Sequence, residues 1–183
     1  MDTRTRALNL SRHYLQTLGF NGFSFQTIAD ALGIKKASLH YHFASKEDLG
    51  LALLEEYERS YKDWSEKVES LPAQKKLEQM LLIFYKMALD ENKICPSGVL
   101  CSDFNTLPKN MKKQLLKFHE FQRAWLKDTL RQGVREKVFR KDLNIDATAD
   151  LLLASVQGGL QMARLRGESE TFKAFTKNLL KTL

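Results

Sequence analysis

The sequence contains few of the residues that interrupt helices or cross-link chains. Its 183 residues include only three prolines and two cysteines, Cys95 and Cys101. No segment shows sustained alternation of apolar and polar residues with glycine-rich turns, so strands are not expected. These absences predict an all-α chain in which the cysteines are reduced thiols and not a disulfide framework.

Long apolar runs are absent as well. The chain has no run of about 18 apolar residues that could span a bilayer, and no apolar signal segment follows residues 1–4. The two cysteines and the distant His119 do not have the spacing of a zinc site. We therefore expect a cytoplasmic protein with no membrane partner, no metal and no cofactor.

The formal net charge of +7 invites a nucleic-acid interpretation, but most of the basic excess lies in residues 109–141. The evidence for DNA binding is local. Residues 35–46 hold three lysines and no acidic residue, and this imbalance is what backbone phosphates would meet.

Residues 25–43 have the pattern of two short helices joined at a glycine. Thr27 can cap the first helix, and Gly33 can end it because a residue without a Cβ adopts the left-handed conformation at little cost. Leu39 and Phe43, four residues apart, anchor the second helix. The pattern predicts a helix-turn-helix whose outward residues are mostly hydrogen-bond donors: Lys35, Lys36, Ser38, His40, Tyr41 and His42.

This stretch resembles the amino-terminal signature of the TetR family of bacterial transcriptional repressors. The matching segments are Thr27-Ile28-Ala29, Gly33-Ile34, Ala37 to Phe43 and Ser45 to Leu49. The resemblance implies that the second helix enters the major groove of double-stranded operator DNA. It also implies which residues contact phosphates and base edges: Gln26, Thr27, Lys36, Ser38, Tyr41, His42 and Lys46. We include Lys35 and His40 among the candidate DNA-binding residues. His40 stands where the family usually has tyrosine, so its role is open. The alternative is a helix hairpin inside an unrelated helical protein.

The rest of the chain has the pattern of further helices. Ser45 and Asp48 form a capping box for a helix to about Val68, and Asp146 can cap another that ends near Leu165. Other helices are predicted at residues 2–18, 75–89, 109–135 and 168–183, with one short helix inside residues 92–108. The resemblance implies about nine helices: a three-helix DNA-binding domain, residues 1–48, and a helical bundle for ligand binding and dimerisation, residues 49–183.

The segment Asn92–Pro108 resembles the C-P-x-G-x-L segment of one subset of this family, through residues 95–100. Each cysteine is either a small buried apolar residue or a thiol that senses oxidants and electrophiles. The basic face of the helix at residues 109–135 is either a solvated face or a surface that attracts an anionic ligand.

The resemblance also implies an effector pocket within the bundle. Its candidate lining residues are Tyr57, Tyr61, Trp64, Phe84, Tyr85, Cys95, Cys101, Phe104, Phe118, Phe121, Trp125, Gln157 and Met162. An aromatic-rich cavity with few charges would suit a flat apolar or mildly polar small molecule, whose identity the sequence does not give.

The last two helices are the predicted homodimer interface. Apolar and very small residues there would permit close helix approach: Leu152, Ala154, Ser155, Gly158, Gly159 and Met162. The alternative is that Gly158 and Gly159 form a kink against the core of their own subunit.

The function predicted from these features is a repressor released from a palindromic operator by a small-molecule or thiol-reactive effector. One alternative is a DNA-binding protein without an effector. Another is a cysteine-dependent hydrolase that uses His119, although the chain has no phosphate loop, carboxylate pair or Ser/His/Asp constellation.

Overall fold

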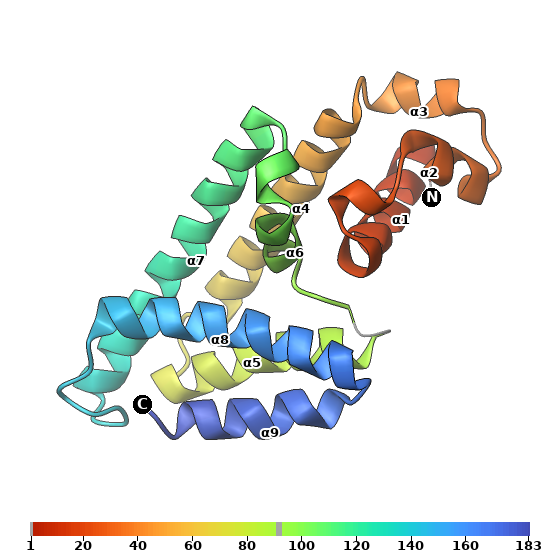
Figure 1. The fold of residues 1–183 in the computed structure, drawn as a ribbon. Helices are drawn as coiled ribbons and strands as arrows, with labels where there is room; N and C mark the ends of the chain where they lie inside the picture. The colour runs from red at the N-terminus through yellow and green to blue at the C-terminus, as the bar shows by residue number, and fades with distance from the viewer. Residues whose placement is uncertain (1, 91–92) are drawn as a thin grey trace. The chain divides into compact units, whose positions relative to one another are not determined.

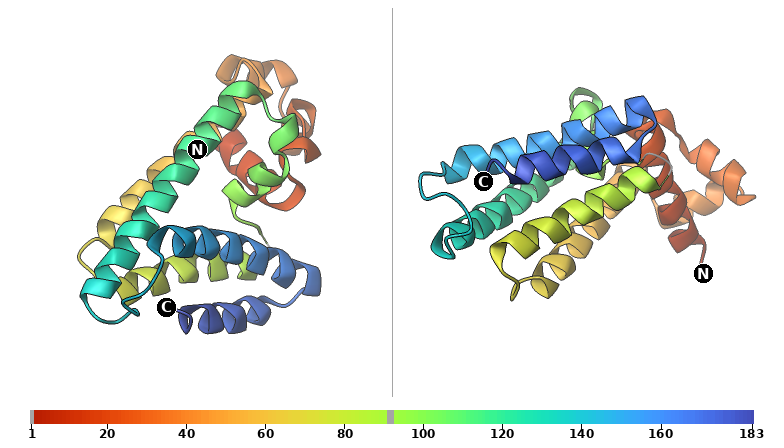
Figure 2. Two further views of the ribbon diagram at one scale, coloured as in Figure 1. Left: turned by 60° about the vertical axis from the view of Figure 1, so that its left-hand side comes forward. Right: turned by 90° about the horizontal axis from the view of Figure 1, so that it is seen from below.

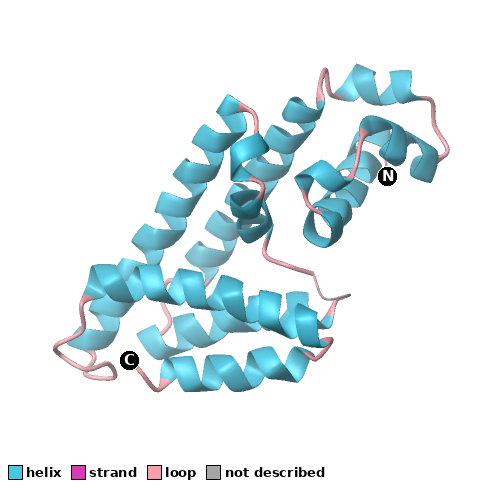
Figure 3. Cartoon of the chain, in the orientation of Figure 1, coloured by secondary structure: helices cyan, strands magenta, loops and turns pink. Residues whose placement is uncertain are grey.

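The computed structural model describes residues 2–90 and 93–183, and within these ranges every regular element is helical (Figure 3). The predicted all-α fold is confirmed. The elements are α1 (Thr3–Leu18), η1 (Phe20–Gly22), α2 (Phe25–Leu32), α3 (Lys36–His42), α4 (Lys46–Lys67), α5 (Ala73–Leu89), α6 (Pro96–Ser102), η2 (Phe104–Thr106), α7 (Lys109–Arg135), α8 (Ile145–Arg166) and α9 (Ser169–Leu180). Asn92, the first residue of the predicted break before α6, lies outside the described residues.

Two of the predicted helix caps were wrong. Ser24, not Thr27, is the N-cap of α2: the Thr27 amide donates to Ser24 Oγ at 3.2 Å, and the Ser24 amide donates to Thr27 Oγ1 at 3.2 Å. Asn144, not Asp146, caps α8, because its Oδ1 accepts the Ala147 amide at 3.1 Å.

The cap predicted at Ser45 is confirmed, since its Oγ accepts the Asp48 amide at 3.1 Å.

The described chain packs as two compact units, each assembled from two separate segments of the sequence. The first unit comprises residues 1–60 and 96–118, and the second comprises residues 61–95 and 119–183. Helices α4 and α7 each contribute to both units. The division into a DNA-binding domain, residues 1–48, and a helical bundle, residues 49–183, stays a prediction.

The first unit is built around α1, which packs against α2, α3, η1 and α6 (Figure 1). Leu8 and Leu15 on α1 are 2% and 1% exposed, and Ile28 on α2 is fully buried. Because α2 and α3 have only 8 and 7 residues, they are too short to be stable alone. Their position therefore depends on this packing.

The second unit contains three helices, α5, α8 and α9, each of which packs against the other two (Figures 1 and 2). Leu77 of α5, Leu152 of α8 and Phe172 of α9 are 0–1% exposed and form its core. Gly159 permits close contact with α9, because a Cβ there would lie 2.8 Å from the Phe175 ring. A Cβ at Gly158 would meet nothing within 4 Å.

No helix in the described part of the chain is long and apolar enough to cross a membrane. Among residues 2–90 and 93–183, no group of three or more His, Cys, Asp and Glu side chains is placed to hold a metal ion.

Replacing Gly133 with alanine should destabilise the second unit. A Cβ at this position would lie 1.9 Å from a ring carbon of the buried Phe139, so the ring or the end of α7 must move. Overpacking of this kind costs about 1–3 kcal/mol. Urea unfolding of Gly133→Ala, Phe139→Leu and the double variant would measure it. The smaller leucine should relieve the clash, so the double variant should lose less stability than the sum of the two single variants. Strictly additive changes in the free energy of unfolding would contradict the contact.

Candidate nucleic-acid interface

The turn between α2 and α3 is set by Gly33 at the C-cap of α2. Its φ of 65° is in the left-handed region, and its amide donates to the carbonyls of Ala29 and Asp30. The following Ile34 amide donates to Ala29 O at 3.0 Å, which completes the helix stop. The predicted helix-turn-helix geometry is therefore present.

Helix α3 is anchored by two apolar residues. Leu39 is fully buried, and Phe43 at the C-cap is 3% exposed. The Arg4 guanidinium lies 5.3 Å from the centre of the Phe43 ring. With this side of the helix buried, the other positions face away from the core. The exposed residues of α3 and its N-cap include Lys35, Lys36, Ser38, His40 and Tyr41.

Three aromatic side chains at the end of α3 differ in how firmly they are held. Tyr41 is 86% exposed, and its ring makes an edge contact with the half-buried His42, with centroids 5.2 Å apart. The His40 ring packs on Phe25 at 4.9 Å, and its Nδ1 lies 3.3 Å from the Ala44 carbonyl oxygen. Tyr41 is thus the most available of the three, whereas His40 is attached to the unit's own core.

The two predicted contacts on α2 already have partners within the helix. Gln26 is exposed and donates from Nε2 to Asp30 Oδ1 at 2.7 Å. Thr27 is exposed, but its hydroxyl takes part in the cap with Ser24. A phosphate contact by Gln26 would have to exchange one hydrogen bond for another.

Lys46 is half-buried at the start of α4 and is directed at the η1 turn. Its Nζ donates to Phe20 O at 2.5 Å and lies 4.5 and 4.8 Å from the centres of the Phe20 and Phe23 rings. Burial lowers the pKa of Lys46, although the nearby Asp103 carboxylate acts in the opposite direction. Any phosphate contact of Lys46 therefore competes with its role in holding this turn.

The same turn is held from the other side by Asp103. Its Oδ2 accepts the Phe20 amide at 2.7 Å, and Thr106 of η2 accepts a hydrogen bond from the Asn21 side chain at 2.8 Å. We name Lys46, Phe20 and Asp103 the turn clasp. Sequence reasoning missed Asp103 because it lies 83 positions from Phe20, and no local pattern marks the pair.

Four of the predicted pocket residues form one aromatic cluster in the second unit. Tyr61 lies 5.3 Å from Trp64, 5.6 Å from Phe121 and 6.1 Å from Trp125, measured between ring centres. The two indole rings are 4.9 Å apart. Burial, and secondarily the nearby Cys95, raises the pKa of the Tyr61 hydroxyl, so this phenol stays neutral.

The other predicted pocket residues have varied surroundings. Tyr85 donates to Glu170, Tyr57 lies under the Arg12 guanidinium, and Phe104 is 44% exposed beneath Lys112. Buried members of the set are Phe84, Cys95 and Phe118; Gln157 is half-buried, and Cys101 and Met162 are exposed.

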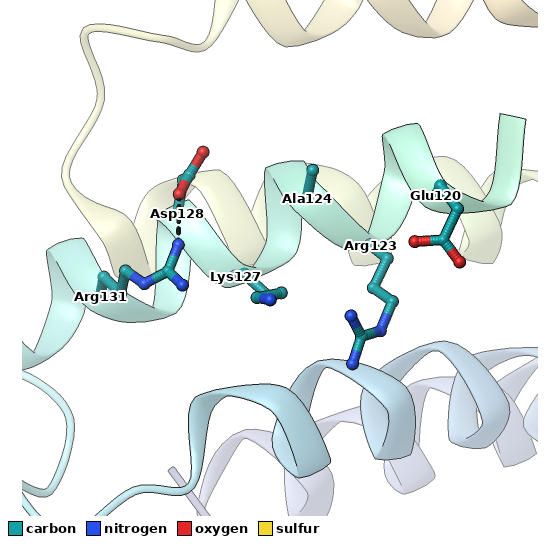
Figure 4. A pocket seen from close by; sticks show the side chains of 6 residues that line it. All are labelled: Glu120, Arg123, Ala124, Lys127, Asp128 and Arg131. Atoms are coloured by element: carbon teal, nitrogen blue, oxygen red, sulfur yellow. Dashed lines mark hydrogen bonds and ion pairs between the residues drawn. The ribbon is translucent and has the colours of Figure 1, made fainter. Parts of the chain in front are cut away.

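The basic face of α7 contains a surface pocket, shown in Figure 4, whose charges are largely neutralised. Arg123 points toward α8, where Asp150 and Asp146 accept from its guanidinium. Lys127 also pairs with Asp146, and Arg131 pairs with Asp128. Hydrogen bonding to these bases lowers the pKa of both α8 carboxyls. These ion pairs therefore join α7 to α8. They leave little unpaired positive charge in the pocket for an anionic ligand.

The residues predicted for the dimer interface divide between two faces of α8. Leu152 and Gly159 are buried within the protomer, and Ser155 is half-buried. Ala154, Gly158 and Met162 are exposed. Three further apolar residues of α8, which were not among those predicted for the interface, are also exposed: Ala147, Leu151 and Leu165. Their spacing of three and four residues is the signal that could have revealed them.

A helical chain with this helix-turn-helix and its exposed row of donors has the architecture of a DNA-binding regulator. Residues 8–53 match the family of bacterial regulatory proteins of the tetR type, and residues 73–179 match the tetracyclin repressor-like C-terminal domain. The chain belongs to the TetR family of transcriptional regulators. This is a family of DNA-binding transcription factors and not of enzymes.

Individual relatives agree over most of the chain. A TetR transcriptional regulator from Legionella pneumophila is 31% identical with a TM-score of 0.89, over 100% of this chain and 98% of its own. One from Agrobacterium tumefaciens is 26% identical with a TM-score of 0.90, over 98% and 96%. The HTH-type transcriptional repressor DhaR of Mycobacterium sp. (strain GP1) is 26% identical over 164 residues, 86% of this chain and 80% of DhaR. Membership of the C-P-x-G-x-L subset stays a prediction.

Removal of the Asp103 carboxylate should loosen the turn clasp. Asp103→Ala leaves the Phe20 amide without its acceptor, and hydrogen bonds to charged groups contribute about 1.5–3 kcal/mol. Asp103→Asn retains an acceptor and should cost less. Urea unfolding and hydrogen exchange at the Phe20 amide would measure both effects, with the exposed Asn105→Ala as control. Unchanged Phe20 exchange in Asp103→Ala would contradict the contact.

Proposed function

We propose that the chain is a repressor that binds a palindromic operator as a homodimer and releases it when an effector acts on the helical bundle. The observation that carries DNA binding is the exposed face of α3, where Lys36, Ser38 and Tyr41 are held outward by the burial of Leu39 and Phe43. Lysines on such a face release counterions from phosphates, while hydroxyl groups can reach phosphates or base edges.

An exposed apolar stripe on α8 supports the homodimer. Leu151, Met162 and Leu165 are 57%, 52% and 79% exposed. They continue the row of Ala154 and Gly158, whose small size permits close helix approach. A second copy seated on this stripe would remove the apolar surface from water. Two α3 helices could then meet half-sites about 34–36 Å apart on DNA.

Release requires an effector that binds the DNA-incompetent arrangement better than the DNA-competent one. Such an effector is either a small molecule that binds beside the aromatic cluster or a reagent that modifies a thiol. Cys101 on α6 is exposed and Cys95 is buried, so Cys101 is the thiol that an electrophile would meet first. The remaining alternative is a DNA-binding protein whose operator affinity responds to no effector.

Lys36→Ala should weaken operator binding several-fold and reduce the slope of log K against log salt by about 1, because one phosphate contact is lost. Gel shifts at several salt concentrations would measure the slope. The matched control is Lys86→Ala on α5, another exposed lysine. An unchanged slope in Lys36→Ala, or an equal change in the control, would refute the assignment of Lys36 to phosphate.

Met162→Glu should shift the protein from dimer to monomer, because a carboxylate on the α8 stripe would be buried without a partner. Sedimentation velocity would measure the mass. The control is Leu116→Glu on α7, which replaces a residue of similar exposure, 59% against 52%. A dimer that persists in Met162→Glu and dissociates in Leu116→Glu would place the interface elsewhere.

A further inference from the structure

The aromatic cluster of the second unit contains both tryptophans of the chain. Trp64 lies near the end of α4 and Trp125 lies on α7, with Tyr61 and Phe121 beside them at ring-centre distances of 4.9–6.1 Å. Tyr61, Trp64 and Phe121 are half-buried, whereas Trp125 is 9% exposed. The cluster thus has an inner indole and three outer rings that are partly accessible.

Two buried polar atoms of α7, one in this cluster and one three positions before it, have no hydrogen-bond partner within residues 2–90 and 93–183. They are Nε1 of Trp125, a donor, and Oε1 of Gln122, an acceptor. Gln122 is only 5% exposed and precedes Trp125 by three positions on α7, so the two side chains share a face of the helix. Buried polar groups are normally satisfied, and each exception calls for an explanation.

The charge of the surroundings restricts what could satisfy these atoms. The four rings and the Gln122 amide are neutral, and burial keeps the Tyr61 phenol protonated. An ionised ligand would therefore find no counter-charge among these groups, which is unfavourable for a buried charge. A neutral planar molecule could instead stack on the rings and present one acceptor and one donor.

We infer that the Tyr61, Trp64, Phe121 and Trp125 cluster binds a neutral planar aromatic molecule whose acceptor takes the Trp125 N–H and whose donor meets Gln122 Oε1. This inference rests on the proposed function and specifies the chemical class of its effector. Because both polar atoms are enclosed, one of the outer rings must turn aside when the ligand enters.

The position of the two tryptophans supplies a direct test, since all tryptophan fluorescence of the chain originates in this cluster. Benzamide, a neutral aromatic amide with an adjacent acceptor and donor, should quench the emission of the full-length protein saturably. Acetophenone, which lacks the donor, should bind about tenfold more weakly, as expected for one lost hydrogen bond. Benzoate, which is anionic, should not saturate.

Two variants test the polar contacts separately from stacking. Trp125→Phe removes the N–H and keeps a ring, while Trp64 remains as the reporter; benzamide should bind about tenfold more weakly. Gln122→Leu should abolish the preference for benzamide over acetophenone. Circular dichroism must show both variants folded, and Leu81→Ala in α5, at a buried residue outside the predicted pocket set, controls for general changes of the buried core. Absence of saturable quenching in the wild type, as expected if a structural water satisfies both atoms, would overturn the inference.

A gel shift with benzamide separates this inference from the proposed function. Quenching together with release of operator DNA supports both. Quenching without release supports the binding site but contradicts release by a ligand at this site. Operator binding that responds only to thiol reagents, with no quenching by benzamide, overturns the inference and leaves DNA binding intact.

Discussion

The burial of Leu39 and Phe43 is the constraint on which the proposed DNA-binding surface of α3 depends. Helix α3 has only seven residues, too few to be stable or to fix its own rotation without packing. With Leu39 fully buried and Phe43 3% exposed, only one rotation of the helix is possible. The donors between and beside these anchors must then point outward. The chemistry of the surface therefore follows from two apolar residues that lie in the core.

The η1 turn of the first unit likewise depends on contacts with residues far away in the sequence, which form the turn clasp. The peptide groups of the η1 turn are held by Lys46 through the Phe20 carbonyl and by Asp103 through the Phe20 amide. Lys46 begins α4, and Asp103 directly follows α6. The first compact unit accordingly includes residues 96–118 as well as residues 1–60. A change in the position of Asp103 would thus act on Phe20, the residue whose carbonyl Lys46 holds.

What could be predicted from the sequence was local. The helix stop at Gly33 and the helix cap at Ser45 depend on neighbouring residues alone, and both predictions are confirmed. The caps at Thr27 and Asp146 were wrong because a second capable residue lies nearby in each case: Ser24 shares a reciprocal cap with Thr27, and Asn144 precedes Asp146 by two positions. Asp103 and Gln122 could not be assigned, since their importance comes from the spatial environment and not from any spacing in the chain.

Helix α8 shows how one element can serve a core and an open surface together. The sequence left open whether Gly158 and Gly159 face a partner or their own subunit. Consecutive residues on a helix point about 100° apart, so the two need not share an answer. Gly159 lies against Phe175 of α9, where a Cβ would clash, whereas Gly158 faces open space among exposed apolar residues. The tight packing of Gly159 against α9 thereby fixes the face of α8 on which Gly158 and the exposed apolar residues are presented.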